Sequence, residues 1–109
     1  MTTIIFRKSV SGEYKEIECL GHAGFDAYGK DIVCAALSVL VINTLNSLDA
    51  LCKTDMDVRQ NEEKGQIKCT FRKPLQSGEQ LLLDSLALGC NAIEQQYGKK
   101  YCKIRFEEV

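Results

Sequence analysis

The sequence has almost no surplus of charge of either sign. Fourteen basic residues stand against fifteen acidic ones, a formal net charge of −1. Proteins that coat nucleic acids or bind membranes through basic clusters need an excess of positive charge, so neither function is expected. The chain also lacks a long apolar run. The longest, from Ile32 to Ile42, is interrupted by Ser38 and followed by Asn43, which predicts no membrane span.

The sequence also lacks the features of a secreted protein and of a protein with a structural metal site. Arg7 and Lys8 follow the apolar residues of the N-terminus rather than precede them, so a secretory signal peptide is not expected. Six cysteines occur without a CxxC pair, and the single histidine, His22, has no cysteine or second histidine at metal-ligand spacing. We expect free thiols in a reducing cytoplasm, with neither a structural metal nor a cofactor.

A chain of 109 residues that is 45% hydrophobic can bury a core as one domain, residues 1–109. Residues 3–8 and 14–20 predict an antiparallel hairpin, because Ile17 and Cys19 alternate with glutamates and a Ser-Gly pair marks the turn. The same alternation predicts a second hairpin over residues 56–72 and a last strand over 100–107.

Two helices are predicted between these strands. The first, from Asp31 to Cys52, is apolar on nearly every side, which indicates cover by a second helix and by a partner subunit. The second, from Ser77 to Tyr97, opens with a capping-box spacing between Ser77 and Gln80. The order β-β-α-β-β-α-β predicts an α+β fold, a small sandwich of a mostly antiparallel sheet and two helices.

The residues that suggest chemistry lie between Gly21 and Ser38. The first part holds three glycines and the only histidine, which predicts a flexible loop leading into the helix. Cys34 then falls in the first helical turn, where unpaired N–H groups and the helix dipole stabilise a thiolate. His22 could take the thiol proton, and the same N–H groups could hold an oxyanion. Asp31, Cys34 and Ser38 share one face of the helix.

Structural roles compete with this chemistry. Cys34 could be an inert core thiol, Asp31 could cap the helix, and the Ser38 hydroxyl could bond a backbone carbonyl one turn back. The segment from Gly24 to Asp31 also contains GxxxxGK, the start of a phosphate-binding P-loop. A P-loop needs Ser or Thr next to bind magnesium, whereas Asp31 would repel phosphate, so nucleotide binding is not expected.

Residues 21–23 read GHA and residues 29–38 read GKDIVCAALS. These strings, with the short N-terminal hairpin and the overall length, closely resemble the ribosomal-processing cysteine proteases of the Prp family. The resemblance implies a small bacterial homodimer in which His22 and Cys34 form the catalytic dyad, with Asp31 and Ser38 in supporting positions. It also favours a flexible substrate loop that includes Gly21, Gly24, Phe25, Tyr28 and Gly29.

The function that the resemblance implies is removal of a short N-terminal extension from ribosomal protein twenty-seven of the large subunit, with cleavage after a Phe. The partners expected are that precursor peptide and a second copy of the chain, but no nucleic acid or membrane. Without substrate, His22 is expected to lie too far from Cys34 to react until the peptide brings it in. The competing hypotheses are a ribosome-associated peptide-binding module without catalysis, and a redox sensor that lacks a second thiol close in sequence.

Overall fold

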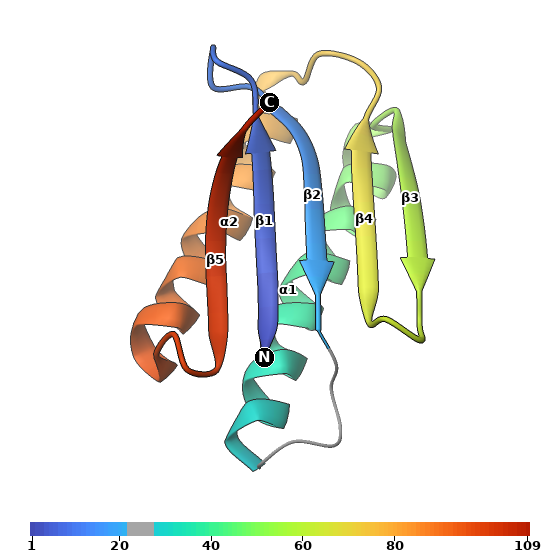
Figure 1. Cartoon of the computed structure of the whole chain (residues 1–109). Helices are drawn as coiled ribbons and strands as arrows, with labels where there is room; N and C mark the ends of the chain where they lie inside the picture. Colours follow the sequence, from blue (N-terminus) through green and yellow to red (C-terminus); the bar gives the residue numbers. More distant parts are fainter. Residues whose placement is uncertain (22–27) are drawn as a thin grey trace.

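The computed structural model describes residues 1–21 and 28–109, with side chains for all of these except 28–31. The helices and strands follow one another in the predicted order (Figure 1). They are β1 (Thr2–Lys8), β2 (Tyr14–Leu20), α1 (Tyr28–Cys52), β3 (Met56–Asn61), β4 (Gln66–Phe71), α2 (Ser77–Tyr97) and β5 (Cys102–Glu108). The predicted α+β class is confirmed.

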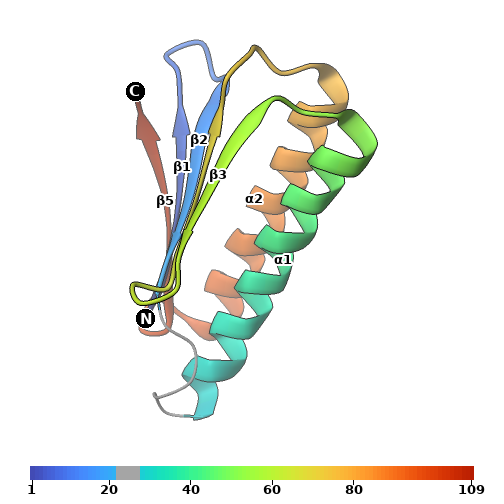
Figure 2. The same ribbon diagram turned by 90° about the vertical axis from the view of Figure 1, so that its right-hand side faces the viewer.

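The strands form one five-stranded sheet in the order β3-β4-β2-β1-β5. Every neighbouring pair is antiparallel except β1 and β5, which run parallel because α2 carries the chain back across the sheet. Both helices cover the same face of the sheet, so the molecule has two layers (Figure 2). The strands β3 and β5 are left as the two edges of the sheet.

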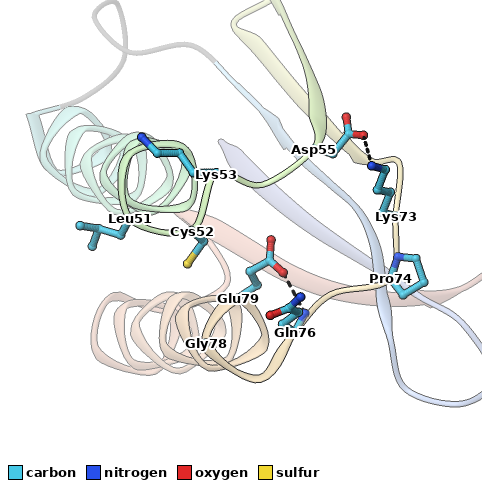
Figure 3. A pocket seen from close by; sticks show the side chains of 9 residues that line it. All are labelled: Leu51, Cys52, Lys53, Asp55, Lys73, Pro74, Gln76, Gly78 and Glu79. Atoms are coloured by element: carbon cyan, nitrogen blue, oxygen red, sulfur yellow. Dashed lines mark hydrogen bonds and ion pairs between the residues drawn. The ribbon is translucent and has the colours of Figure 1, made fainter.

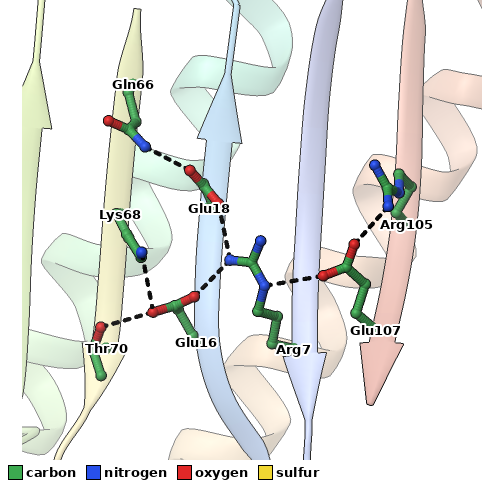
Figure 4. A network of polar contacts seen from close by, with 8 residues as sticks. All are labelled: Arg7, Glu16, Glu18, Gln66, Lys68, Thr70, Arg105 and Glu107. Carbon is green, nitrogen blue, oxygen red and sulfur yellow. Dashed lines mark hydrogen bonds and ion pairs between the residues drawn. The ribbon is translucent and has the colours of Figure 1, made fainter. Parts of the chain in front are cut away.

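The predicted alternation sorts each strand into a core face and a solvent face. On the core side Phe6 pairs in register with Ile17 of β2, and both are fully buried. On the other side Arg7 lies among carboxylates, 2.5 Å from Glu16, 2.8 Å from Glu18 and 3.1 Å from Glu107 (Figure 4). Ion pairs that bridge three strands satisfy the polar groups of the face that no helix covers.

The long helix α1 buries one side against the sheet. Val33, Leu37 and Leu48 are fully buried, whereas Val39, on the opposite side of the helix, is 65% exposed. By length and composition alone, the 21-residue stretch Ile32–Cys52 has the character of a membrane span, because its most apolar 18 residues have a mean hydropathy of 1.7. The sequence prediction considered only the shorter apolar run. The burial of one complete side favours the core helix of a two-layer domain, which meets the same criteria.

The predicted start of α1 needs correction, whereas α2 begins at Ser77 as predicted. The helix α1 begins at Tyr28, not at Asp31, so Tyr28 and Gly29 belong to its first turn rather than to the loop. A glycine costs a helix only about 1 kcal/mol relative to alanine, which the packing of α1 on the sheet outweighs. The capping residue of α2 also differs from the prediction, because the N-cap is Gln76, whose backbone N–H donates to the Glu79 carboxylate at 2.8 Å. A carboxylate suits the positive end of the helix dipole better than the predicted amide of Gln80 does.

Gly89 lies where the two helices approach each other. A Cβ at this position would be 3.2 Å from Cδ1 of Leu40 on α1. The glycine therefore allows close helix packing, which offsets the helix propensity it costs.

Candidate active site

Cys34 and Ser38 line one cavity. It has a volume of about 260 Å³ and lies between α1, the end of β2 and the turn that joins β3 to β4. Cys34 is 4% exposed, and Ile42, one helical turn beyond Ser38, continues the same wall. The predicted sharing of one helix face by Cys34 and Ser38 is confirmed, and it gives a thiol and a hydroxyl a common cavity.

Gly21 forms the opposite corner of this cavity. Its N–H donates to the carbonyl oxygen of Gly65 in the β3–β4 turn at 3.1 Å. Its φ is +144°, and a Cβ here would lie 2.7 Å from the carbonyl oxygen of Met1 and 2.8 Å from Cα of Thr2. Only glycine fits this backbone, so Gly21 fixes the point where the chain leaves β2 for the segment that carries His22.

The position of Cys34 along α1 differs from the prediction. Because the helix begins at Tyr28, Cys34 is in its second turn and not its first. The dipole effect falls off within the first turn, so it supports a thiolate less than expected. The N–H groups of residues 28–31, which have no acceptor within the helix, lie one turn before Cys34, on the side towards which helical side chains tilt.

Several predicted residues lie outside what the structure describes. His22, Gly24 and Phe25 fall in the segment 22–27, and the side chains of Tyr28 and Asp31 are not described. Their roles as general base, substrate loop and supporting acid remain predictions.

A second thiol, Cys19 at the end of β2, lines the same cavity as Cys34. Burial, with a smaller contribution from the neighbouring Cys34, raises the pKa of Cys19 to about 11. It therefore stays a protonated thiol at neutral pH and is unsuited to attack. The alternation in β2 predicted that Cys19 points to the core, but no sequence signal predicted that α1 would set Cys34 beside it.

The other buried cysteines are also poor nucleophiles. Burial raises the pKa of both Cys69 and Cys90 to about 12. All six cysteines are free thiols, as predicted. Among the described side chains, those of residues 1–21 and 32–109, no group of three or more from His, Cys, Asp or Glu could hold a metal ion.

A larger cavity, about 460 Å³, lies at the other end of α1 (Figure 3). Three of its charged side chains already have partners. The Lys73 ammonium lies 3.7 Å from the Asp55 carboxylate, and Glu79 accepts the hydrogen bond that caps α2. The 18 residues of helix that separate Cys34 from Cys52 correspond to roughly 27 Å, so this cavity is no part of the Cys34 site.

A family model of the cysteine protease Prp matches residues 1–103 of the chain. The chain belongs to the Prp cysteine protease family. Two ribosomal processing cysteine proteases Prp are similar to it along nearly their full lengths. The one from Staphylococcus aureus is 24% identical over 99 residues, which cover 91% of this chain and 93% of the relative. The one from Bacillus subtilis is 26% identical over 101 residues, 89% and 90% of the two chains.

Solved structures share the fold, one of them a Prp protease. The essential ribosomal processing protease Prp from Staphylococcus aureus, crystallised with a substrate peptide, has a TM-score of 0.90 at 21% identity, covering 98% of this chain and 100% of that one. SMU.848 from Streptococcus mutans has a TM-score of 0.87 at 26% identity and covers 100% and 99%. The resemblance inferred from GHA and GKDIVCAALS is thus confirmed, and membership of the family makes this chain a cysteine protease.

Proposed function

We propose that this Prp-family chain is a ribosomal-processing endopeptidase. Its substrate would be the precursor of ribosomal protein twenty-seven of the large subunit, cut after a Phe to remove a short N-terminal extension. The observation that carries the proposal is the placement of Cys34 in a cavity that opens along α1, within the family's motif. The Staphylococcus aureus relative has been crystallised with a substrate peptide and with a covalently linked product peptide, which supports peptide cleavage through an acyl-enzyme.

The proposed acylation step uses His22 and Cys34. The imidazole of His22 takes the proton of the Cys34 thiol, and the thiolate sulfur bonds to the scissile carbonyl carbon. The carbonyl oxygen becomes an oxyanion, which the unpaired N–H groups at the start of α1 would stabilise. When the intermediate collapses, the C–N bond breaks and the imidazolium of His22 protonates the departing amine. A thioester on Cys34 remains.

Water then hydrolyses the thioester. His22 takes a proton from water, the hydroxide oxygen bonds to the thioester carbon, and the C–S bond breaks to release the carboxylic acid product and the Cys34 thiolate, after which the acid gives its proton to solvent. Asp31 would orient the imidazole, and Ser38 would donate a hydrogen bond to the thiolate. Phe25, Tyr28 or the partner subunit would supply the apolar surface for the substrate's Phe.

The test is cleavage of a peptide that copies the extension junction, followed by mass spectrometry. Wild type should cut after the Phe, and Cys34→Ala should not. Cys52→Ala is the matched control, because Cys52 is half-buried at the far end of α1 and should retain activity. Tight binding by all three proteins without cleavage would instead support a peptide-binding module.

We also propose a homodimer in the bacterial cytoplasm, where ribosomes assemble. The sides of the helices turned from the core expose large apolar residues, among them Val39 at 65%, Leu81 at 69% and Leu88 at 73%. Exposed apolar surface of this kind on one layer suits association with a second copy.

Sedimentation at micromolar concentration tests the dimer. Wild type should sediment as two copies, and Val39→Glu should shift it towards one copy because a charge would be buried in the interface. The control is Val10→Glu, the same substitution at a residue that is 86% exposed in the β1–β2 turn. It should leave the sedimenting mass at two copies. A wild-type monomer contradicts the proposal.

A further inference from the structure

The cavity at Cys34 has a second cavity beside it. The second has a volume of about 330 Å³ and lies between α1 and β3. Ile42 and Gln60 line both cavities, so the two are adjacent. We call the two adjacent cavities together the α1–β3 groove. Its second half is lined by Ile42, Leu45, Asn46, Asp49, Thr54, Met56, Val58 and Gln60.

One wall of this groove is a row of alternate side chains on β3, of which Met56 and Val58 are apolar. Met56, Val58 and Gln60 alternate along the strand and line the groove, whereas Asp57 and Arg59 pair with each other at 2.8 Å on the other face. Val58 is 41% exposed, and Ile42 on the facing helix is 44% exposed. These two side chains leave apolar surface in contact with water next to the cavity of Cys34.

β3 is also an edge of the sheet. It pairs with β4 from Met56 to Asn61 and has no strand on its other side among the described residues. An edge strand presents backbone N–H and C=O groups that an extended peptide can pair with. At six residues, β3 can direct a peptide segment of similar length.

The described side chains give the groove a negative charge. Among them, the charged residues that line the groove are Glu62, in the half near Cys34, and Asp49, in the distal half. Two carboxylates, with no Lys or Arg among the described lining residues, favour a peptide that carries positive charge. Basic segments are typical of proteins that bind the phosphates of nucleic acid, which is the class of substrate proposed above.

We propose that the α1–β3 groove binds one flank of the substrate peptide, extended along β3, with an apolar side chain against Val58 and a basic side chain beside Glu62 or Asp49. This inference rests on the proposed function and makes the groove a specificity site for the same reaction. The flank binds through backbone pairing to the edge strand, and its side chains are selected by alternate residues of β3.

Peptides of three kinds test the proposal. One is the short junction peptide alone, and the second and third add six residues, the length of β3, on either side of the junction. For the wild type, one of the extensions should raise kcat/KM by roughly tenfold, the factor equivalent to about 1.4 kcal/mol. The same extension with its basic residues replaced by glutamate should lose that gain.

The variant Val58→Arg should reduce the ratio of long-peptide to short-peptide kcat/KM to about one. Val10→Arg is the matched control, because it makes the same substitution at an exposed residue outside the groove and should keep the wild-type ratio. Val58→Thr keeps the shape of the side chain and should lower the ratio in part, which covers the case in which the arginine variant does not fold.

The outcomes separate this inference from the proposed function. If wild type cleaves the short peptide but gains from neither extension, the groove does not bind a flank, although the protease assignment stands. Retention of the full gain by Val58→Arg overturns the inference in the same way. If wild type cleaves none of the peptides, the proposed function fails, and the groove proposal fails with it.

Discussion

Replacement of Gly21 by alanine tests how the fold holds the segment that precedes His22. Gly21 combines a φ of +144° with backbone atoms of Met1 and Thr2 at 2.7 and 2.8 Å from the place of a Cβ. Both neighbours are backbone atoms at the start of β1, a strand paired on both sides, which cannot move aside like the end of a flexible side chain. The substitution must therefore either displace that strand or pull the corner of the Cys34 cavity open.

The expected cost has two parts. A residue with a Cβ held in this region of the backbone costs about 1–3 kcal/mol, and overpacking against fixed atoms costs a similar amount. We expect Gly21→Ala to lower the free energy of unfolding by roughly 3 kcal/mol. In a domain of this size that corresponds to a fall of roughly 10–15 °C in Tm. Peptide cleavage by the folded fraction should also fall, because Gly21 precedes His22 directly.

Thermal unfolding by circular dichroism measures this, with two glycine controls. Gly12 has a φ of +86° with nothing within 4 Å of its Cβ position, so Gly12→Ala adds backbone strain alone, roughly 1 kcal/mol. Gly78 has open space and no positive φ, so Gly78→Ala should be neutral or slightly stabilising. If Gly21→Ala melts within a few degrees of Gly12→Ala, the close approach of Gly21 to β1 is refuted.

Three further predictions concern the rest of the domain. Burial raises the pKa of Glu18, but hydrogen bonds from Gln66 and Arg7 outweigh it and hold the pKa below the ordinary 4.5. The ionised carboxylate therefore stabilises the fold above pH 4.5, and this stability is lost as the pH falls through the lower pKa of the folded state. In urea denaturation, Glu18→Gln should lose less of its unfolding free energy than wild type as the pH is lowered. Iodoacetamide at neutral pH should label half-buried Cys52 before Cys69 or Cys90 in mass mapping, and equal rates would contradict the burial of the last two. Leu37→Ala, at a fully buried site, should cost about 2–5 kcal/mol in urea denaturation, whereas Leu51→Ala, 76% exposed, should change stability by less than about 0.5 kcal/mol.

The sequence predicted the order of elements because its alternation and its turn residues were clear. Ile17 and Cys19 alternate with glutamates and do face the core, and the strand bounds Tyr14–Leu20 match the prediction. The parallel pairing of β1 with β5 was not predicted, because neither strand's pattern records which neighbour it takes. Such long-range pairing depends on how α2 returns the chain across the sheet.

The start of α1 and the cap of α2 were predicted less well, although the end of α1 and both ends of α2 match. Gly29 looked like a loop residue, yet it lies in the first turn of α1, where the packing of the helix on the sheet outweighs the small cost of a glycine. This error moved Cys34 from the first to the second turn, and so changed the electrostatic argument for its reactivity. In α2, both Gln76 with Glu79 and Ser77 with Gln80 have capping-box spacing, and the structure uses the pair that contains the carboxylate.

For the site, the sequence provided the residues on one helix but not what faces them. Helical spacing predicted that Cys34 and Ser38 share a face, and they share a cavity. The companions of Cys34 from other elements, such as Cys19 and Gly65, are distant in sequence and meet it only through the packing of α1 on the sheet. Short-range spacing carries no information about such contacts.

Covalent trapping tests most directly the central claim that Cys34 is the nucleophile. A junction peptide that ends in a phenylalanine chloromethyl ketone would be incubated with wild type, Cys34→Ala and Cys19→Ala, and the adduct located by intact mass and peptide mapping. We predict one added peptide on Cys34 in wild type and in Cys19→Ala, and none in Cys34→Ala. An adduct on Cys19, the other thiol of the cavity, or equal labelling of Cys34→Ala, would contradict the account.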